Sequence, residues 1–471
     1  MTAAHTYFLR SFGCQMNEHD AERIRALLEG QGLERVADPA AADVLVYNTC
    51  TVRKSADERL AGHLSTAARL KREDPRKVVV VTGCLPQSEK QALFEHFPFV
   101  DAAVGPQSLH RLPEALSVAL SASHGLSGSP TVCSSGLGRA VDAGGRASAP
   151  CPPLGYFEDE GCMSGDLPAR RQRRFQAWVQ IMSGCTNYCA YCIVPFVRGP
   201  ERSRLPETIE SEVRCLVADG VKEVTLLGQN VNAYGRDLAA AGAPAGTPTP
   251  TFAALLRRLD RVPGLGRVRF MTSHPKDLSN ELVAAIAELP SVCEHVHLPA
   301  QSGSDRVLRA MKRGYTAARY LERVAALRAA VPEVAITSDL IVGFPGETEE
   351  DFRATLHLVE RAGFDAAFTF VYSPRPGSAA ADYPDLLSGE VKRERVERLI
   401  EFTQHQAAQR RAAAVGKTCE VLVEGPSRRG GLLRGRTRQN VTVNFSGRAR
   451  PGDLIPVRIT SATSTTLRGS V

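Results

Sequence analysis

Cys185, Cys189 and Cys192 form the densest group of potential metal ligands in the chain. They follow the apolar run from Phe175 to Met182, which predicts a buried strand with the three cysteines on the loop that leaves it. Three thiolates on one short loop can bind three irons of a cubane cluster, whereas a ferredoxin supplies a fourth cysteine. No Cys or His lies between Ile193 and Gly199. The spacing therefore predicts a cluster with one iron left open for a small chelating ligand.

Two other interpretations of this triplet are weaker. A structural zinc site needs four ligands and a catalytic one needs three and a water, and such sites usually use C-x2-C pairs or histidines. Three unrelated thiols are less expected still at this density. The C-x3-C-x2-C triplet resembles the signature of the radical S-adenosylmethionine (SAM) superfamily. That resemblance implies a 4Fe-4S cluster whose open iron takes the amino and carboxylate groups of SAM.

The composition is that of an ordinary globular protein. The 471 residues are 43% hydrophobic and 23% charged, which allows two to four domains, each with its own core. No apolar run is long enough to cross a membrane, and the first residues lack the basic start and apolar stretch of a secretory signal. We therefore expect a cytoplasmic location and no membrane partner. The twelve cysteines then favour metal binding or catalysis over disulfides.

The first 120 residues alternate short apolar runs with helical patterns, which predicts a parallel α/β sheet. The helix from Asn17 to Gly30 is expected to begin at an Asn cap and to end at Gly. The other expected elements are strands at Tyr7–Gly13, Val44–Tyr47 and Lys77–Thr82, and helices at Lys54–Glu73 and Gln87–Phe97.

Cys14, Cys50 and Cys84 each come just after one of these strands. Because the carboxyl ends of parallel strands meet at one edge of a sheet, the three thiols can converge on a ligand. Gly13 and Gly83 would let the backbone approach a bulky group. Three buried core thiols are the alternative. The repeated position after three strands favours a second metal site, again with an open iron.

The residues around these three cysteines resemble those of the methylthiotransferases. Phe12-Gly-Cys-Gln-Met-Asn-Glu, Asn48-Thr-Cys-Thr-Val-Arg and Gly83-Cys are similar to the N-terminal domain of that family. The resemblance implies that Cys14, Cys50 and Cys84 carry an auxiliary 4Fe-4S cluster.

Residues 121–170 are expected to form a flexible linker or insertion between two domains. Much of this stretch is rich in Ser, Gly, Ala and Pro, a composition with little to bury. Its Cys133, Cys151 and Cys162 have no ligand-like spacing and are expected to be free thiols. The sequence does not indicate what this insertion does.

Residues 171–402 again alternate strands and helices, which predicts a partial (β/α)6 barrel with its active site at the carboxyl ends of the strands. Polar clusters lie at those ends. By resemblance to radical SAM enzymes, Gly228, Gln229 and Asn230 are expected to bind the SAM amino group. Tyr191 is expected to hold the adenine through its backbone, and the ribose and methionine parts are assigned to Gln301, Ser338 and Asp339. The expected strands are Trp178–Met182, Glu223–Leu227, Val268–Thr272, His295–Leu298, Ala335–Val342 and Ala367–Tyr372.

Residues 403–471 alternate short strands with Gly and Pro turns, which predicts a small β-barrel. The chain has a net charge of +7, and its basic surplus is concentrated here, as in a nucleic-acid-binding module. The module resembles a TRAM domain, an RNA-binding barrel; a dimerisation or docking barrel is the alternative. The expected RNA contacts are Arg428, Arg429, Arg434, Arg436 and Arg438. Cys215, Cys293 and Cys419 are expected to be buried thiols and not ligands.

The whole arrangement resembles the tRNA-2-methylthio-N6-dimethylallyladenosine synthases, the MiaB group of methylthiotransferases. The similarity includes Thr225-Leu-Leu-Gly-Gln-Asn-Val-Asn-Ala and Val371-Tyr-Ser-Pro-Arg-Pro-Gly. It implies that two 4Fe-4S clusters and SAM add a methylthio group to carbon 2 of N6-isopentenyl-adenosine beside the anticodon. It also implies three partners: the tRNA anticodon stem-loop, a flavodoxin- or ferredoxin-like reductant and the iron–sulfur assembly machinery. We expect a monomer, with no catalytic residues beyond the cluster ligands.

Three other functions stay open at this point. Sister methylthiotransferases modify threonylcarbamoyl-adenosine in tRNA or an aspartate of a small-subunit ribosomal protein. The ribosomal-protein group usually has Asn-Thr-Cys-Gly and Gln-His-Gly-Ser where this chain has Asn48-Thr-Cys-Thr and Gln301-Ser-Gly-Ser. From a different class, the chain could be a non-catalytic iron–sulfur sensor that binds RNA. Cleavage of SAM on reduction would exclude that function.

Overall fold

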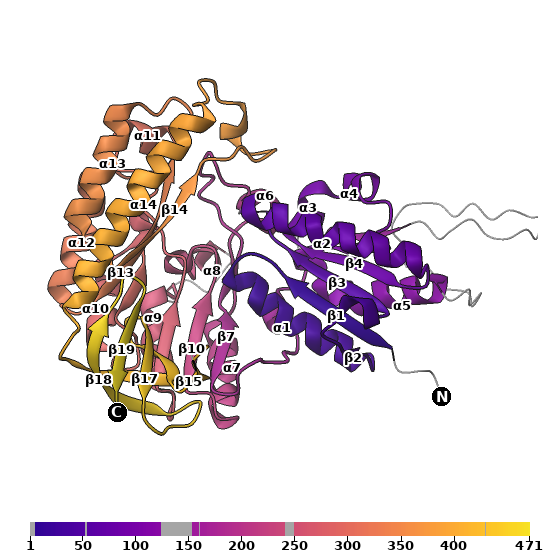
Figure 1. Cartoon of the computed structure of the whole chain (residues 1–471), viewed down its shortest axis with the longest axis horizontal. Helices are drawn as coiled ribbons and strands as arrows, with labels where there is room; N and C mark the ends of the chain where they lie inside the picture. The colour runs from indigo at the N-terminus through magenta and orange to yellow at the C-terminus, as the bar shows by residue number, and fades with distance from the viewer. Residues whose placement is uncertain (1–4, 52–53, 124–152, 160, 241–248, 429) are drawn as a thin grey trace, which may run out of the picture. The chain divides into compact units, whose positions relative to one another are not determined.

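The computed structural model describes residues 5–51, 54–123, 153–159, 161–240, 249–428 and 430–471. The chain divides into two compact units (Figure 1). The first comprises Met1–Arg170 and Phe196–Gly199, and the second comprises Arg171–Pro195 and Pro200–Val471. Among the described residues, no helix has both the length and the apolar composition needed to cross a bilayer.

The first unit is built on a parallel α/β sheet, as the sequence predicted. The sheet has six strands in the order β2-β1-β3-β4-β5-β6, of which the sequence predicted three. Its strands are β1 Thr6–Ser11, β2 Glu34–Arg35, β3 Val44–Thr49, β4 Val78–Gly83, β5 Ala102–Val104 and β6 Leu154–Tyr156. Its helices are α1 Gln15–Gly30, α2 Lys54–Glu73, α3 Cys84–Glu89, α4 Ala92–His96 and α5 Leu112–Ser123.

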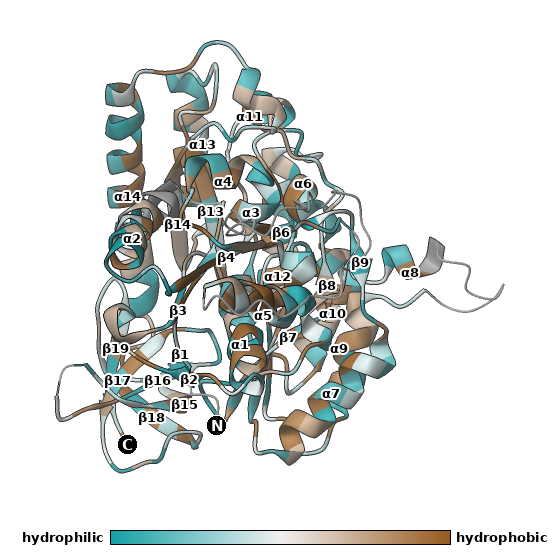
Figure 2. Ribbon diagram, turned by 90° about the vertical axis from the view of Figure 1, so that its right-hand side faces the viewer, coloured by the Kyte–Doolittle hydropathy of each residue, from teal (hydrophilic) through white to brown (hydrophobic). Residues whose placement is uncertain are grey.

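Helices cover both faces of this sheet, so its central strands have no solvent-facing side. β3 and β4 are buried at every residue, and Figure 2 shows them as hydrophobic segments. Val44 and Val46 pack with residues of α1 and α5, whereas Leu45 and Tyr47 pack on the opposite face with residues of α2 and α4. This two-sided burial is why the strands are continuous apolar runs and do not alternate.

Three local features of this unit differ from the prediction. Asn17 is not a cap, because α1 begins at Gln15 after the cap residue Cys14. The stretch from Gln87 to Phe97 is not one helix, because Lys90 (φ +49°) interrupts it between α3 and α4. Leu154–Tyr156, which the composition assigned to the linker, pairs with β5 as the sixth strand of the sheet.

The second unit contains the predicted six-stranded partial barrel, in two three-stranded parallel sheets, β7-β10-β11 and β12-β13-β14. The sheets adjoin where the amide of Cys293 donates to Val268 O (2.9 Å) and the amide of Ser273 donates to His297 O (3.4 Å). The strands are β7 Gln176–Gln180, β10 Glu223–Leu227, β11 Arg267–Phe270, β12 His295–His297, β13 Ala335–Val342 and β14 Ala366–Val371.

Helices surround this barrel on its outer side, and their apolar residues form one large core with the outward-facing residues of the strands. The longer helices are α7 Pro206–Ala218, α9 Phe252–Asp260, α10 Asn280–Glu288, α12 Ala317–Ala330, α13 Glu349–Ala362 and α14 Gly389–Ala412. Three short helices, α6 Val194–Arg198, α8 Arg236–Ala240 and α11 Asp305–Ala310, lie in the loops. Cys215 on α7 is exposed, so the prediction that it is buried is wrong.

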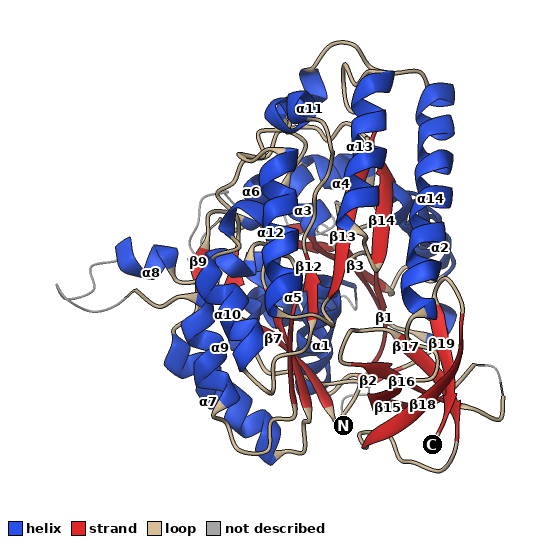
Figure 3. Cartoon of the chain, turned by 90° about the vertical axis from the view of Figure 1, so that its left-hand side faces the viewer, coloured by secondary structure: helices blue, strands red, loops and turns tan. Residues whose placement is uncertain are grey.

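A closed five-stranded barrel ends the chain, in the order β15-β16-β17-β19-β18 (Figure 3). Alternate residues such as Val421, Val423, Val443 and Phe445 fill its interior. The Gly- and Arg-rich strands β16 and β19 were not predicted, because they lack an apolar run. The strands are β15 Thr418–Pro426, β16 Leu433–Thr437, β17 Thr442–Ser446, β18 Leu454–Ala462 and β19 Thr466–Ser470.

Candidate functional site

The three N-terminal cysteines lie at the carboxyl ends of neighbouring parallel strands. Cys14 precedes α1, Cys50 follows β3 directly, and Cys84 is the first residue of α3 after β4. Cys50 and Cys84 are buried. A hydrogen bond from the Cys50 thiol is the main cause that lowers the pKa of Cys14 to about 6, and the charge of Arg198 contributes. Cys84 interacts electrostatically with both Cys14 and Arg198, so the thiols form one group.

Two glycines make room for this group. Gly83 has φ +94°, and a Cβ there would clash with Thr49 O and lie 2.7 Å from Asn48 Oδ1. Gly13 has φ +110°, and its Cβ would lie 2.7 Å from the Cys50 sulfur. These backbone conformations favour glycine because it has no Cβ. The sequence analysis singled out both glycines for a different reason, the approach of the backbone to a bulky ligand.

Asn17 ties the strand ends together from inside α1. Its Nδ2 donates to Phe12 O (2.7 Å) and to Thr49 O (2.8 Å), and its own carbonyl accepts from Asn48 Nδ2 (2.8 Å). The side chain therefore serves tertiary hydrogen bonds between the first two cysteine loops and does not cap the helix. Sequence reasoning assigned Asn17 to a cap because both roles use the same short amide.

The second cysteine group lies on the loop after β7, where the sequence placed it. Cys185 and Cys189 are buried and Cys192 is half-buried. Burial raises the pKa of Cys192 to about 12, and it also raises the pKa of Cys185. Thiolates are therefore costly here without a compensating positive charge, which a bound iron cluster would supply.

Backbone hydrogen bonds hold this loop at both ends. The amide of Gly184 donates to Gln229 Oε1 (2.6 Å). The amide of Ala190 donates to Met311 O (3.0 Å), and the Ala190 carbonyl accepts from the amide of Ala380 (2.7 Å). The loop is thereby fixed to three separate parts of the barrel.

Arg313 is a site residue that sequence reasoning missed. Its buried guanidinium donates from Nη1 to the Cys189 sulfur (3.3 Å) and from Nη2 to Pro299 O (3.0 Å). Arg313 follows Cys189 by more than a hundred residues, so no local spacing connects them. Locally, Arg313 is only part of a Lys-Arg-Gly turn after α11.

The three residues assigned to the SAM amino group differ in their surroundings. Gln229 holds the cysteine loop through Gly184. Asn230 is buried and donates from Nδ2 to Asp277 Oδ2 (2.8 Å). Its Oδ1 accepts no hydrogen bond from any described residue, so it can accept one from an ammonium group. Gly228 lies against Met182, where a Cβ would crowd the thioether side chain.

The residues assigned to the ribose, methionine and adenine parts of SAM lie in different environments. Ser338 is fully buried, and its hydroxyl bonds Leu298 O (3.1 Å) and the amide of Ala300 (2.9 Å), which is a role within the fold. Gln301 has φ +67° and joins the backbone of β13. Asp339 Oδ2 lies 3.4 Å from His297 Nε2. Tyr191 is half-buried beside the cysteine loop, and burial raises the pKa of its hydroxyl well above the usual range.

The two clusters predicted from the sequence therefore have ligand sets of suitable chemistry. Among the described residues, no three His, Cys, Asp or Glu side chains are arranged to bind one metal ion together. A cubane cluster takes one thiolate on each of three different irons, so its ligands need not meet at one point.

The C-terminal barrel docks at the amino ends of the β10 and β11 strands. Arg267 at the start of β11 donates to Glu420 Oε1 (2.8 Å) and to Arg436 O (3.0 Å). Arg269 donates to Thr437 O (2.7 Å) and to Glu223 Oε2 (2.9 Å). Both arginines are buried. The small barrel is thus bonded to the edge opposite the one that carries the second cysteine group.

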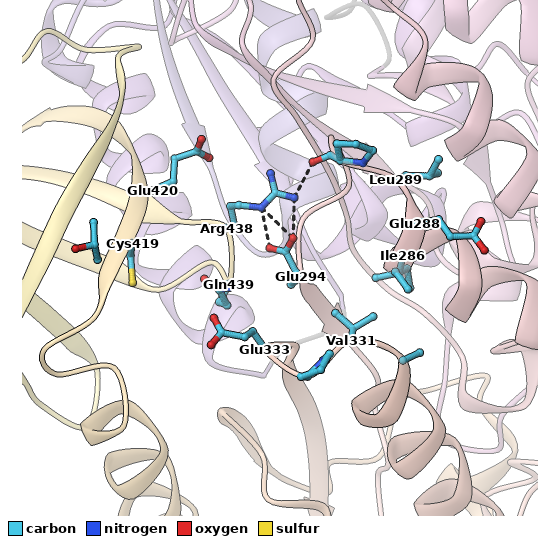
Figure 4. A pocket seen from close by; sticks show the side chains of 15 residues that line it. Ile286, Glu288, Leu289, Glu294, Val331, Glu333, Cys419, Glu420, Arg438 and Gln439 are labelled. Atoms are coloured by element: carbon cyan, nitrogen blue, oxygen red, sulfur yellow. Dashed lines mark hydrogen bonds and ion pairs between the residues drawn. The ribbon is translucent and has the colours of Figure 1, made fainter.

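The predicted RNA-contacting arginines differ in their surroundings. Arg438 donates to both oxygens of Glu294 beside a cavity of 630 Å³ between the two barrels (Figure 4). It also donates to Val292 O (2.7 Å). Arg434 and Arg436 pair with Glu424 (3.2 and 2.9 Å). Arg428 is exposed, and Arg429 lies outside the described residues.

The remaining cysteines have separate positions. Cys162 is half-buried, and its thiol donates to Met163 O (3.2 Å). Cys293 is buried, as predicted, and Cys419 is half-buried. Cys133 and Cys151 lie outside the described residues.

Three known families match separate parts of the chain. Residues 179–359 match the Radical SAM superfamily, residues 6–105 match the Uncharacterized protein family UPF0004, and residues 412–471 match the TRAM domain. The structure of the radical S-adenosylmethionine methyltransferase TsrM from Kitasatospora setae superposes with a TM-score of 0.54 at 16% identity, over 80% of this chain and 74% of that chain. This likeness concerns the fold.

Curated relatives are similar along almost the whole chain. The tRNA-2-methylthio-N(6)-dimethylallyladenosine synthase of Caldicellulosiruptor saccharolyticus is 44% identical over 93% of this chain and 86% of its own length. The protein of the same name from Thermoanaerobacter pseudethanolicus is 42% identical over 99% and 92%, and that from Clostridium botulinum is 41% identical over 98% and 96%. The chain therefore belongs to the tRNA-2-methylthio-N(6)-dimethylallyladenosine synthase family of radical SAM proteins.

Proposed function

We propose that this chain adds a methylthio group to carbon 2 of N6-isopentenyl-adenosine beside the anticodon of tRNA. The observation that carries the proposal is the presence of two separate cysteine triplets, each at the carboxyl ends of parallel strands. One triplet has the spacing that binds a SAM-cleaving cluster, and the other, at Cys14, Cys50 and Cys84, is proposed to hold a second cluster that delivers sulfur. The names of the curated relatives and the TRAM match support tRNA as the substrate.

The residues of the barrel would bind and orient the cofactors. Cys185, Cys189 and Cys192 would hold the radical cluster, and Arg313 would stabilise the thiolate of Cys189 through its hydrogen bond. Asn230 Oδ1 is free to accept a hydrogen bond from the SAM amino group, and Asp339 would bind a ribose hydroxyl. When bound, the cluster and SAM supply the radical chemistry that an unreactive aromatic C–H bond requires.

The C-terminal barrel would contribute RNA affinity. Exposed arginines such as Arg428 would contact phosphates, while the base to be modified would be unstacked at the barrel mouth, as in other recognition of single-stranded loops. A reductant must supply the electron. A flavodoxin- or ferredoxin-like protein is the partner we propose, and the iron–sulfur assembly machinery would load the clusters.

An anaerobic assay with three substrates tests the proposal. The protein is reconstituted with iron and sulfide, reduced with dithionite and given SAM. Isopentenylated tRNA, threonylcarbamoylated tRNA and the small-subunit ribosomal protein are offered separately, and mass spectrometry follows the methylthio mass. We expect product only on the isopentenylated tRNA. Product on another substrate would keep the chemistry and overturn the substrate, whereas no cleavage of SAM would contradict the enzymatic function.

A further inference from the structure

Arg198 is a buried cation near the N-terminal thiols, and the sequence analysis did not single it out. It lies on α6, only six residues after Cys192 (198 − 192 = 6). Residues Phe196–Gly199 nevertheless belong to the first unit, although the chain on both sides of them belongs to the second. A short segment that follows the radical-cluster loop therefore supplies a side chain to the N-terminal unit.

Backbone and side-chain contacts fix the position of Arg198. Its carbonyl accepts a hydrogen bond from Gln107 Nε2 (2.8 Å), and Gly199, with φ +73°, ends the helix directly after it. Its Nη2 donates to Asp20 Oδ2 (3.0 Å). Arg198 and Asp20 are both almost fully buried.

Asp20, which binds the guanidinium, is itself held in place by hydrogen bonds. Its Oδ1 accepts from the hydroxyl of Ser164 (2.7 Å) and lies 3.3 Å from His19 Nδ1. Burial alone would raise the pKa of Asp20, but Arg198 and these hydrogen bonds outweigh it and hold that pKa well below the usual range. The carboxylate therefore stays charged and orients the guanidinium.

Arg198 also interacts with sulfur. Its charge interacts electrostatically with both Cys84 and Cys14. Its positive charge is thus placed against two of the three thiols proposed to bind a cluster. A buried cation close to the ligand sulfurs stabilises the more negative, reduced state of an iron–sulfur cluster.

We propose that Arg198 is a positioning residue that raises the reduction potential of the cluster bound by Cys14, Cys50 and Cys84, with Asp20 opposing it. The inference rests on the proposed second cluster. Because Asp20 is negative and bonds the same guanidinium, the two residues must shift the potential in opposite directions. A purely structural role for the pair would not produce opposite signs.

The test uses the full chain with Cys185, Cys189 and Cys192 changed to Ala, so that only the N-terminal cluster can form. After anaerobic reconstitution, iron is counted and the midpoint potential is measured by redox titration followed with electron paramagnetic resonance. Arg198→Met is expected to shift the potential to a more negative value, Arg198→Lys to shift it less, and Asp20→Asn to shift it to a more positive value. Arg111→Met is the control, because Arg111 lies in the same unit and bonds Glu114 (2.8 Å).

The outcomes separate the two proposals. If the parent variant binds no iron, the second cluster and the proposed function fail, whatever Arg198 does. If the parent binds a cluster and neither Arg198→Met nor Asp20→Asn shifts its potential relative to Arg111→Met, the role of Arg198 is overturned. A shift of the same sign in both variants would also overturn it. If Arg198→Met loses the cluster, the signs are read from Arg198→Lys and Asp20→Asn.

Discussion

The two cysteine groups are proposed to have separate chemical roles. The N-terminal thiols and the radical triplet belong to different compact units, so each group can be removed without touching the ligands of the other. We expect the variant with Cys14, Cys50 and Cys84 changed to Ala to lose methylthiolation completely while still cleaving SAM. Chromatography of 5′-deoxyadenosine and mass spectrometry of the tRNA measure the two activities side by side. Full product formation by the triple variant would contradict the assignment.

The backbone conformation of Gly83 shapes the site of the N-terminal thiols. A methyl group there would clash with Thr49 O, and φ +94° strains any residue with a Cβ. Gly83→Ala should therefore lower the free energy of unfolding by about 1–3 kcal/mol and reduce the iron bound by the N-terminal thiols.

Gly62 provides the matched control for Gly83. It lies within α2, and a Cβ at this position meets no atom within 4 Å. Gly62→Ala should leave stability unchanged or raise it by about 0.5–1 kcal/mol, since alanine is the better helix former. Denaturant unfolding and iron analysis compare the two variants. Equal iron content in both would show that the glycine geometry does not matter for the thiols.

Buried histidines on several secondary-structure elements should make the stability of the fold depend on pH. His295 on β12 is buried, with Arg269, His297 and Arg436 as charged or titratable neighbours, and burial lowers its pKa to about 3. Burial similarly lowers the pKa of His274 to about 2 and that of His19 to about 4. All three are neutral in the folded chain, whereas in the unfolded chain they gain a proton near pH 6.5.

The sign of the resulting pH dependence follows directly. Because the folded pKa lies below the unfolded one, the stability is present above pH 6.5 and is lost as pH falls toward the folded values. At pH 5 the loss should reach about 2 kcal/mol for each histidine. His295→Gln keeps a side chain that can bond the Thr337 hydroxyl but removes one proton. Urea unfolding at pH 7.5 and 5 should show a drop smaller by about 2 kcal/mol in this variant; an unchanged drop would refute the role of His295.

Helices and strands could be predicted where the local sequence pattern indicated them. β10 and β13 occupy the predicted ranges, β13 although Thr337, Ser338 and Asp339 interrupt its apolar residues. β6 was missed because it has only three residues and lies in a stretch that was assigned to the linker by its composition. The sites divide in the same way. The cysteine triplets have a readable position after strands, whereas Arg198 and Arg313 reach their sulfurs only through tertiary folding.

At the scale of the whole molecule, the small C-terminal barrel is held by buried polar bonds and not by a flexible tether. Arg267 is fully buried and its hydrogen bonds end on Glu420 and on backbone carbonyls of the small barrel. Since these bonds lie at the starts of the strands and the second cysteine group lies past the end of β7, an RNA that contacts both must extend along the barrel wall. Figures 1 and 3 show the small barrel at this position.

Two arginines of the small barrel should therefore respond differently to removal. Arg428 is exposed, whereas Arg438 bonds Glu294 and the carbonyl of Val292. Arg428→Ala should weaken tRNA binding and reduce the slope of log Kd against log salt by about 0.7–0.9, the value for one lost phosphate contact, with no change in unfolding. Arg438→Ala should instead lower the free energy of unfolding by about 1–3 kcal/mol, because it leaves Glu294 and buried carbonyls without their donor.

Salt titrations of tRNA binding and thermal unfolding of both variants measure this contrast. If Arg438→Ala lowers the salt slope as Arg428→Ala does and unfolds like the parent chain, then Arg438 contacts RNA and the bond to Glu294 is dispensable for docking. If Arg428→Ala leaves the slope unchanged, the RNA surface lies elsewhere on the barrel. The expected result would mean that the outer loops of the small barrel bind phosphate. Its inner arginines would instead hold the barrel at the starts of the strands, at the edge opposite the second cysteine group.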